Sequence, residues 1–151
     1  MQDFMNLGIS KIYADQLREQ GITQPTPIQE RVIPLIKAGS DVIAQAQTGT
    51  GKTLAFVLPI LEQINVEAVS PQALVITPTR ELALQITAEL EKLTADVEGI
   101  EILAVYGGQD VERQVKKLKQ KVQFVVGTPG RLLDHIARKT IDLSQLDFLV
   151  L

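Results

Sequence analysis

Five short apolar runs, rich in β-branched residues, constrain the fold of this chain more than any other feature. They are DVIAQ at 41–45, ALVIT at 73–77, EILAVY at 101–106, VQFVVG at 122–127 and DFLVL at 147–151. Segments with helical periodicity separate them, among them RELALQITAELEKL and DVERQVKKLKQK. Continuous apolar strands that alternate with helices are typical of a parallel sheet with helices on both faces. The sequence therefore predicts an α/β fold.

The residues that follow each predicted strand are where we expect function. Crossovers between parallel strands are right-handed, so all the strands end at the same edge of the sheet. Ligands of open α/β sheets bind beyond that edge.

Two helices are predicted before the first strand. One runs from an N-cap at Ser10 to a stop at Gly21, and the other from an N-cap at Thr26 to Gly39. Pro34 lies inside the second helix and is expected to kink or loosen it.

Composition excludes several classes of function. The 151 residues suffice for one domain, and a net charge of −3 argues against binding nucleic acid by bulk positive charge. The chain has no cysteine, which excludes disulfides, thiolate metal sites and cysteine nucleophiles. Its single histidine, His135, excludes a histidine-rich metal site, and we predict a solvated helix position for it. The longest apolar run, LAFVLPIL, is too short to cross a bilayer, and the first ten residues do not form a signal peptide. We expect a cytoplasmic protein without a membrane partner.

The stretch AQTGTGKT follows the first predicted strand and has the character of a phosphate-binding loop. Its glycines let consecutive N–H groups converge on one anion, Lys52 adds a charge for the β- and γ-phosphates, and the Thr53 hydroxyl can ligate Mg²⁺. Alanine can replace the usual first glycine if φ stays negative there. The alternative is a ligand-free glycine-rich turn, which the lysine–threonine pair disfavours. The predicted loop residues are Ala46, Gln47, Thr48, Gly49, Thr50, Gly51, Lys52 and Thr53.

Two later turns, TPTREL and GTPGRLL, resemble each other. In each, a threonine can cap the following helix while an arginine, Arg80 or Arg131, lies in its first turn. In the second turn we expect Thr128 to cap, Pro129 to take the first helical position and Gly130 to allow a close approach. Additional anion sites along one edge suit a longer polyanion held by its backbone. The alternative is two well-capped helices with solvated arginines.

A glycine pair, Gly107 and Gly108, follows the third predicted strand. It suits the close passage of another backbone, although such a pair is usually only a turn.

Gln29 has two interpretations that the local sequence does not separate. TPIQ fits a capping box, in which the glutamine returns to the Thr26 backbone N–H. Alternatively, its amide matches adenine N6 and N7, and the mismatch with guanine would favour ATP over GTP by roughly 1–3 kcal/mol.

Taken together, these motifs resemble one family, the DEAD-box ATP-dependent RNA helicases. GITQPTPIQ at 21–29 resembles its Q motif, and AQTGTGKT its motif I, in which alanine is the usual first residue. PTREL at 78–82, the glycine pair and TPGR at 128–131 resemble its RNA-binding motifs in the correct order. The resemblance implies a RecA-like P-loop domain that uses ATP and Mg²⁺ and binds RNA.

The resemblance also implies roles for individual residues. Phe4 would stack on adenine, Gln29 would read the base, and Thr26 would help to hold that loop. Lys52 and Thr53 would be the catalytic contacts to phosphate and Mg²⁺. The backbone of RNA, without sequence preference, would be held by Pro78, Thr79, Arg80, Gly107, Gly108, Thr128, Pro129, Gly130 and Arg131.

By the same resemblance, residues 1–39 are N-terminal helices with the Q motif and residues 40–151 part of the first RecA-like domain. The family's acidic motif, the motif that couples hydrolysis to unwinding, and the second RecA-like domain with its arginine finger would all follow Leu151. We therefore expect the chain alone to be hydrolytically inactive and its apolar surface to favour self-association. Two alternatives stay open: another P-loop enzyme, such as a kinase or DNA translocase, and a non-hydrolysing module that binds a nucleotide or a protein.

The basic run RQVKKLKQK is predicted to be the outer face of an amphipathic helix. Val111, Val115, Leu118 and Val122 follow helical spacing, so we expect the lysines to be solvated and not to contact RNA.

Overall fold

The computed structural model describes residues 3–47 and 49–151, so the predicted phosphate-binding residue Thr48 lies outside the described residues. The chain forms two compact units, Met1–Gln63 and Ile64–Leu151. The division predicted between residues 39 and 40, into N-terminal helices with the Q motif and part of the first RecA-like domain, stays a prediction.

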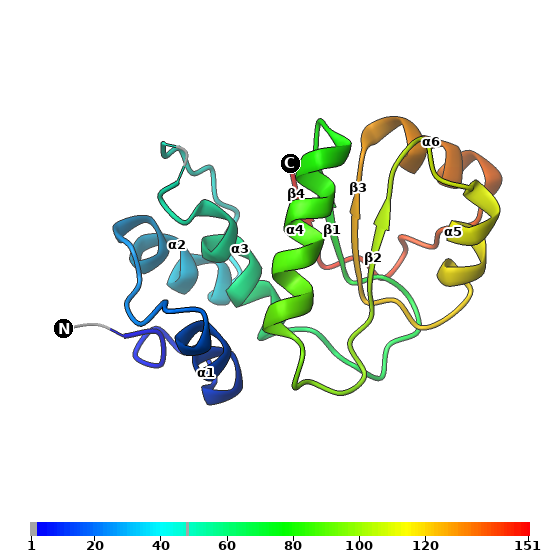
Figure 1. Cartoon of the computed structure of the whole chain (residues 1–151). Helices are drawn as coiled ribbons and strands as arrows, with labels where there is room; N and C mark the ends of the chain where they lie inside the picture. Colours follow the sequence, from blue (N-terminus) through cyan, green and yellow to red (C-terminus); the bar gives the residue numbers. More distant parts are fainter. Residues whose placement is uncertain (1–2, 48) are drawn as a thin grey trace. The chain divides into compact units, whose positions relative to one another are not determined.

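The described residues of the first unit form three helices, namely α1 (Lys11–Glu19), α2 (Pro27–Lys37) and α3 (Lys52–Leu61) (Figure 1). Their starts agree with the sequence, because Ser10 and Thr26 are the N-caps of α1 and α2. Helix α2 runs through Pro34 as one continuous element, and Gly39 follows it with a left-handed φ of 87°. Helices α2 and α3 pack against each other.

The prediction of a strand at 41–45 is wrong. Residues 41–47 have no regular secondary structure, and the side chain of Ile43 is fully exposed, at 104%. An apolar run satisfies only the side-chain requirement of a strand, whereas its backbone N–H and C=O groups also need a neighbouring strand. Among the described residues, no strand pairs with this segment.

The second unit contains the sheet. Its strands are β1 (Ala73–Ile76), β2 (Ile102–Val105), β3 (Phe124–Gly127) and β4 (Phe148–Val150), in the spatial order β2-β3-β1-β4. Every neighbouring pair is parallel. The other four predicted strands are thus confirmed, and their carboxyl ends lie at one edge.

Three helices cover this sheet, α4 (Arg80–Leu93) on one face and α5 (Val111–Leu118) and α6 (Pro129–Arg138) on the other (Figure 1). The prediction of a parallel sheet with helices on both faces is confirmed. The strands are apolar on both sides, and Phe124, Val125 and Val126 of β3 are completely buried. The core beneath α5 and α6 is formed by Leu74, Val105, Val122, Val125 and Leu132.

Two predictions about side chains of α5 and α6 need correction. His135 is completely buried, not solvated, and the buried residue of α5 is Gln114 rather than one of the apolar residues of that helix. Val111, Val115 and Leu118 are only partly buried. A polar network, described below, occupies the space that the apolar spacing was expected to fill.

Candidate nucleotide and polyanion sites

The loop before α3 has the backbone geometry of an anion site. Gly49 and Gly51 have left-handed φ values of 84° and 87°, which favour glycine. The Thr50 hydroxyl donates a hydrogen bond of 2.6 Å to the Gln47 carbonyl and closes the turn. Ala46 has no positive φ, so the condition under which alanine replaces glycine is met.

Helix α3 begins at this loop with Lys52 as its first residue. No side chain among the described residues caps the helix, and its first turn carries no acidic residue. Lys52 is exposed and Thr53 is half-buried. The N–H groups and positive dipole end of α3 therefore remain available to an anion, with the lysine beside them.

Gln29 forms the capping box of α2 and also contacts the phosphate-binding loop. Its Oε1 accepts from Thr26 N at 2.9 Å, and Thr26 Oγ1 accepts from Gln29 N at 3.4 Å. Its Nε2 donates to the Gly51 carbonyl at 3.1 Å. A Cβ on Gly51 would displace this amide from its hydrogen bond, in addition to the strain of the left-handed φ. The side chain is 1% exposed and joins the starts of α2 and α3.

Phe4 lies in the core of the first unit. Its side chain is 3% exposed, and beside it a hollow of about 30 Å³ is lined also by Arg18 and Ile22. Stacking of this ring on adenine stays a prediction.

In the second unit, the ends of β1 and β2 bring Arg80 and the glycine pair together. The Arg80 guanidinium lies 5.4 Å from the centre of the Tyr106 ring, a cation–π contact. A Cβ on Gly108 would lie 3.4 Å from Arg80 Nη1, and Gly108 itself has a left-handed φ of 87°. Two of the predicted RNA-binding residues thus lie side by side.

Arg131 reaches the same loop from α6. Its Nη1 donates to the Gln109 carbonyl at 2.9 Å and to Gln114 Oε1 at 3.1 Å. The side chain is 15% exposed, so it is not completely buried. The Gly107–Gly108 turn and the TPGR turn are consequently tied together.

Gln114 is the centre of this network. Its Nε2 donates to the Tyr106 carbonyl at 3.1 Å and to Gln109 Oε1 at 2.8 Å. Its Oε1 lies 2.8 Å from His135 Nε2 as well as accepting from Arg131. Since Oε1 can only accept, we assign the proton of the neutral imidazole to Nε2, and Nδ1 then accepts from Thr140 Oγ1 at 2.8 Å.

The same surroundings keep His135 neutral. Burial lowers its pKa below the usual value, and the positive charge of Arg131 lowers it further. Sequence reasoning missed the roles of Gln109, Gln114 and His135. The available signal was a glutamine on the inward side of a helix whose apolar positions flank it.

The predicted helix caps differ between the two arginine turns. The Thr79 hydroxyl accepts from Leu82 N at 3.2 Å and caps α4, as predicted. Thr128 is the N-cap residue of α6, but its side chain makes no capping hydrogen bond, and the first turn has no acidic residue. Gly127, just before it, has no room for a side chain, since a Cβ there would lie 2.6 Å from Val105 and 2.8 Å from Leu132.

Two features are absent from the described part of the chain. No helix there is long and apolar enough to span a membrane. No group of three or more histidine, cysteine, aspartate or glutamate side chains lies within reach of one metal ion among residues 3–47 and 49–151.

Fold and turns define an α/β protein of the RecA-like class, with glycine-rich and arginine-bearing turns at the starts of helices. The DEAD/DEAH box helicase family model matches residues 26–151. The chain therefore belongs to the DEAD/DEAH box helicase family.

Individual relatives agree with this assignment. The chain is 49% identical over its whole length to the ATP-dependent RNA helicase CshA of Listeria monocytogenes and 48% identical to the DEAD-box ATP-dependent RNA helicase CshA of Geobacillus kaustophilus. It covers 29% and 32% of these proteins, so it spans about a third of their length. A crystal structure of a DEAD box protein from Methanococcus jannaschii superimposes with a TM-score of 0.91 at 38% identity, covering 99% of this chain and 40% of that one.

Proposed function

We propose that the protein to which this chain belongs uses ATP to bind RNA and to separate short duplexes locally. Family membership and the similarity to the CshA proteins, which are named as ATP-dependent RNA helicases, support this proposal. The observation that carries it is the start of α3, where two left-handed glycines, an uncapped helix N-terminus and the exposed Lys52 meet.

The residues present fit ATP with Mg²⁺. Backbone N–H groups at 49–53 would hold phosphate oxygens, Lys52 would neutralise the β- and γ-phosphates, and the Thr53 hydroxyl would be a ligand of Mg²⁺. The ion would stabilise the charge on the transferred phosphoryl group. Catalysis of this kind is largely positioning and charge stabilisation, and this chain would supply the phosphate cradle.

Gln29 would connect recognition of the base to the phosphate loop. An amide can donate two hydrogen bonds and its oxygen can accept two. The contacts to Thr26 and Gly51 use one of each, which leaves one donor and one acceptor for adenine N7 and N6.

RNA phosphates would be held by the turns of the second unit. Arg80 beside Gly108 and the partly exposed Arg131 supply cations, and the uncapped N-terminus of α6 supplies N–H groups. These contacts address the backbone of the nucleic acid and therefore carry no sequence preference.

The decisive experiment uses the full-length protein. Calorimetry should register binding of ATP with Mg²⁺, and single-stranded RNA should stimulate ATP hydrolysis. Lys52→Ala should abolish hydrolysis, whereas Lys92→Ala, which removes an exposed lysine in the last turn of α4, should not. Equal stimulation by DNA would contradict the RNA assignment and favour a DNA translocase. Absence of ATP binding would contradict the whole proposal.

The chain alone is proposed to hydrolyse no ATP in response to RNA, because the parts that activate water in this family are expected outside it. Turnover by residues 1–151 that Lys52→Ala removes would refute this part of the proposal.

A further inference from the structure

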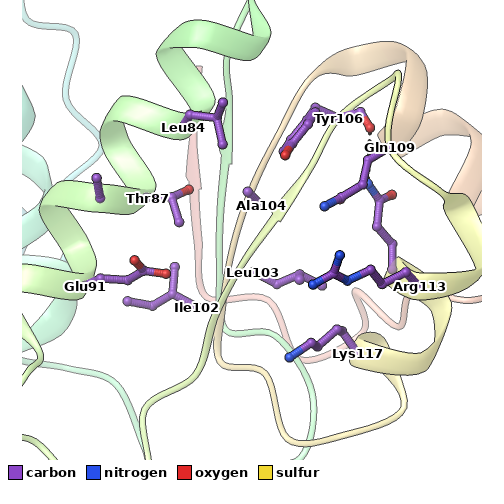
Figure 2. A pocket seen from close by; sticks show the side chains of 12 residues that line it. Leu84, Thr87, Glu91, Ile102, Leu103, Ala104, Tyr106, Gln109, Arg113 and Lys117 are labelled. Atoms are coloured by element: carbon purple, nitrogen blue, oxygen red, sulfur yellow. Dashed lines mark hydrogen bonds between the residues drawn. The ribbon is translucent and has the colours of Figure 1, made fainter.

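The outer edge of β2 lies at the bottom of a groove that the nucleotide and RNA proposals leave unused. The groove encloses about 390 Å³ and lies between α4 and α5 (Figure 2). Figure 2 shows one row of side chains from α4 and another from α5 on either side of β2. We name this feature the β2 groove; its floor is Ile102, Leu103 and Ala104.

The floor has the hydrogen-bonding character of a sheet edge. Strand β2 ends the spatial order of the sheet and pairs only with β3 among the described strands. The carbonyls of Glu101 and Val105 accept hydrogen bonds from the β3 side. Because the pattern along a strand alternates, the N–H and C=O groups of Ile102 and Ala104 face away from β3, into the groove.

The two walls differ in charge. Helix α5 contributes Arg113 and Lys117, one turn apart and both exposed, and neither forms an ion pair with any described residue. Helix α4 contributes Leu84, Thr87 and Ala88 and, at the far end, Glu91. A wall of two unpaired cations thus faces a wall that is apolar or uncharged along most of its length.

Successive side chains of β2 point to opposite faces of the sheet. If a further strand were added at this edge, the same alternation would decide which of its side chains face each wall. Leu103 packs on the core beneath α5 and α6, so Ile102 and Ala104 lie toward α4. An added strand would keep the same alternation. Every second side chain would face Arg113 and Lys117, and the intervening ones would face Leu84 and Ala88.

We propose that the β2 groove binds an extended peptide in which acidic residues alternate with apolar ones, and that this peptide adds a fifth strand to the sheet. Backbone groups of β2 give the affinity, and the two walls select the side chains. This inference does not depend on ATP or RNA. It gives Lys117, which lines the groove and is exposed, a role that Lys116 and Lys119 outside the groove do not share.

A peptide fits the groove better than RNA does. Only two cations line it, Glu91 lies opposite them, and the floor offers alternating amide donors and acceptors beside apolar side chains. Such a floor matches a strand, while a nucleic-acid backbone needs repeated positive charge.

The test titrates the 151-residue chain into fluorescein-labelled Glu-Val-Glu-Val-Glu-Val, acetylated and amidated at its ends, and follows anisotropy. We expect saturable binding, at least tenfold weaker binding with the Arg113→Glu, Lys117→Glu double variant, and less than a twofold change with the Lys116→Glu, Lys119→Glu double variant. The control carries the same charge change on α5 and its C-cap residue, outside the groove. No saturable binding, or equal loss with both variants, would overturn the proposal.

Three further measurements address the backbone and RNA. One peptide is N-methylated at all valines and a second at all glutamates. Only one of the two should lose binding, because only alternate N–H groups of an added strand face β2. Equal binding by both peptides would refute strand addition. Hydrogen exchange at residues 102–104 should slow when the peptide is bound. A ten-nucleotide oligouridine that binds the chain, loses this binding in the Arg113→Glu, Lys117→Glu variant and displaces the peptide would assign the groove to RNA instead.

Discussion

The loop before α3 and the turn before α6 follow the same sequence pattern but form in different surroundings. Each has an apolar β-branched run, a turn of threonine and glycine, and a helix start with a basic residue. The run before α6 is β3, which is paired on both sides and completely buried at Phe124. The run before α3 is largely exposed and pairs with no strand among the described residues, yet Gly49 and Gly51 in the loop after it have left-handed conformations. The turn geometry is thus local, whereas the strand depends on its neighbours.

The largest expected effect contrasts the two runs directly. Phe124→Ala should lower the free energy of unfolding by about 3–5 kcal/mol, because it leaves a cavity in a buried strand. Ile43→Ala removes a side chain that lies entirely in solvent and should change stability by no more than about 0.5 kcal/mol. Urea unfolding followed by circular dichroism measures both. A large loss with Ile43→Ala would show that 41–45 is a packed strand after all.

A smaller effect compares two buried glutamines. Gln114→Leu leaves Arg131 and His135 without their shared acceptor and should cost about 1–3 kcal/mol. Gln29→Leu removes the capping box of α2 and should cost about 1 kcal/mol. Gln114→Glu retains the acceptor for both partners but loses the two hydrogen bonds that Nε2 donates to Tyr106 and Gln109, so it should also be destabilising. If Gln114→Leu were the milder change, the network around Arg131 would not be what fixes that turn.

Opposite pH responses should distinguish the two units. In the second unit, the folded pKa of His135 lies below its unfolded value, so the unfolded chain binds more protons and stability falls as pH drops below about 6.5. The slope from this residue is at most about 1.4 kcal/mol per pH unit, and His135→Gln should remove it. Parallel unfolding curves for both proteins between pH 7.5 and 5.5 would contradict this.

In the first unit, burial, with help from Glu62, raises the pKa of Tyr13 from 10.0 to about 12. The folded state then holds its proton more tightly than the unfolded state, so stability falls as pH rises from 10 toward 12. Tyr13→Phe should lose this alkaline dependence and leave the acid dependence intact. Unfolding measured at pH 9 and pH 11 checks the sign.

The last comparison predicts no change in RNA affinity. Reversing the charge of Lys117 and Lys119 in the full-length protein should leave RNA affinity unchanged, because neither residue lies among the turns proposed to hold RNA. Filter binding at fixed salt concentration would reveal a change, and a loss comparable to that of Arg80→Ala would extend the RNA surface onto α5.

Much of the fold followed from local sequence signals. The caps at Thr26 and Thr79 and four of five strands have short-range causes, namely turn chemistry and apolar runs. What failed depends on distant partners. Whether 41–45 pairs is decided by which strand lies beside it, and whether His135 is buried is decided by Gln114, twenty-one positions away on another helix. The residues proposed to hold ATP and RNA came from motifs, whereas the network that positions Arg131 could not be read from any single segment.

Gly127 carries a consequence for how the TPGR turn can vary. With Val105 and Leu132 pressed against its α-carbon, even one methyl group would push β3 away from β2 or lift α6 off the sheet. The positions of Thr128 and Arg131 depend on this close packing of Gly127 against Val105 and Leu132. The position of Arg131 therefore depends on Gly127 having only a hydrogen atom as its side chain, although Gly127 is not itself among the residues proposed to bind RNA.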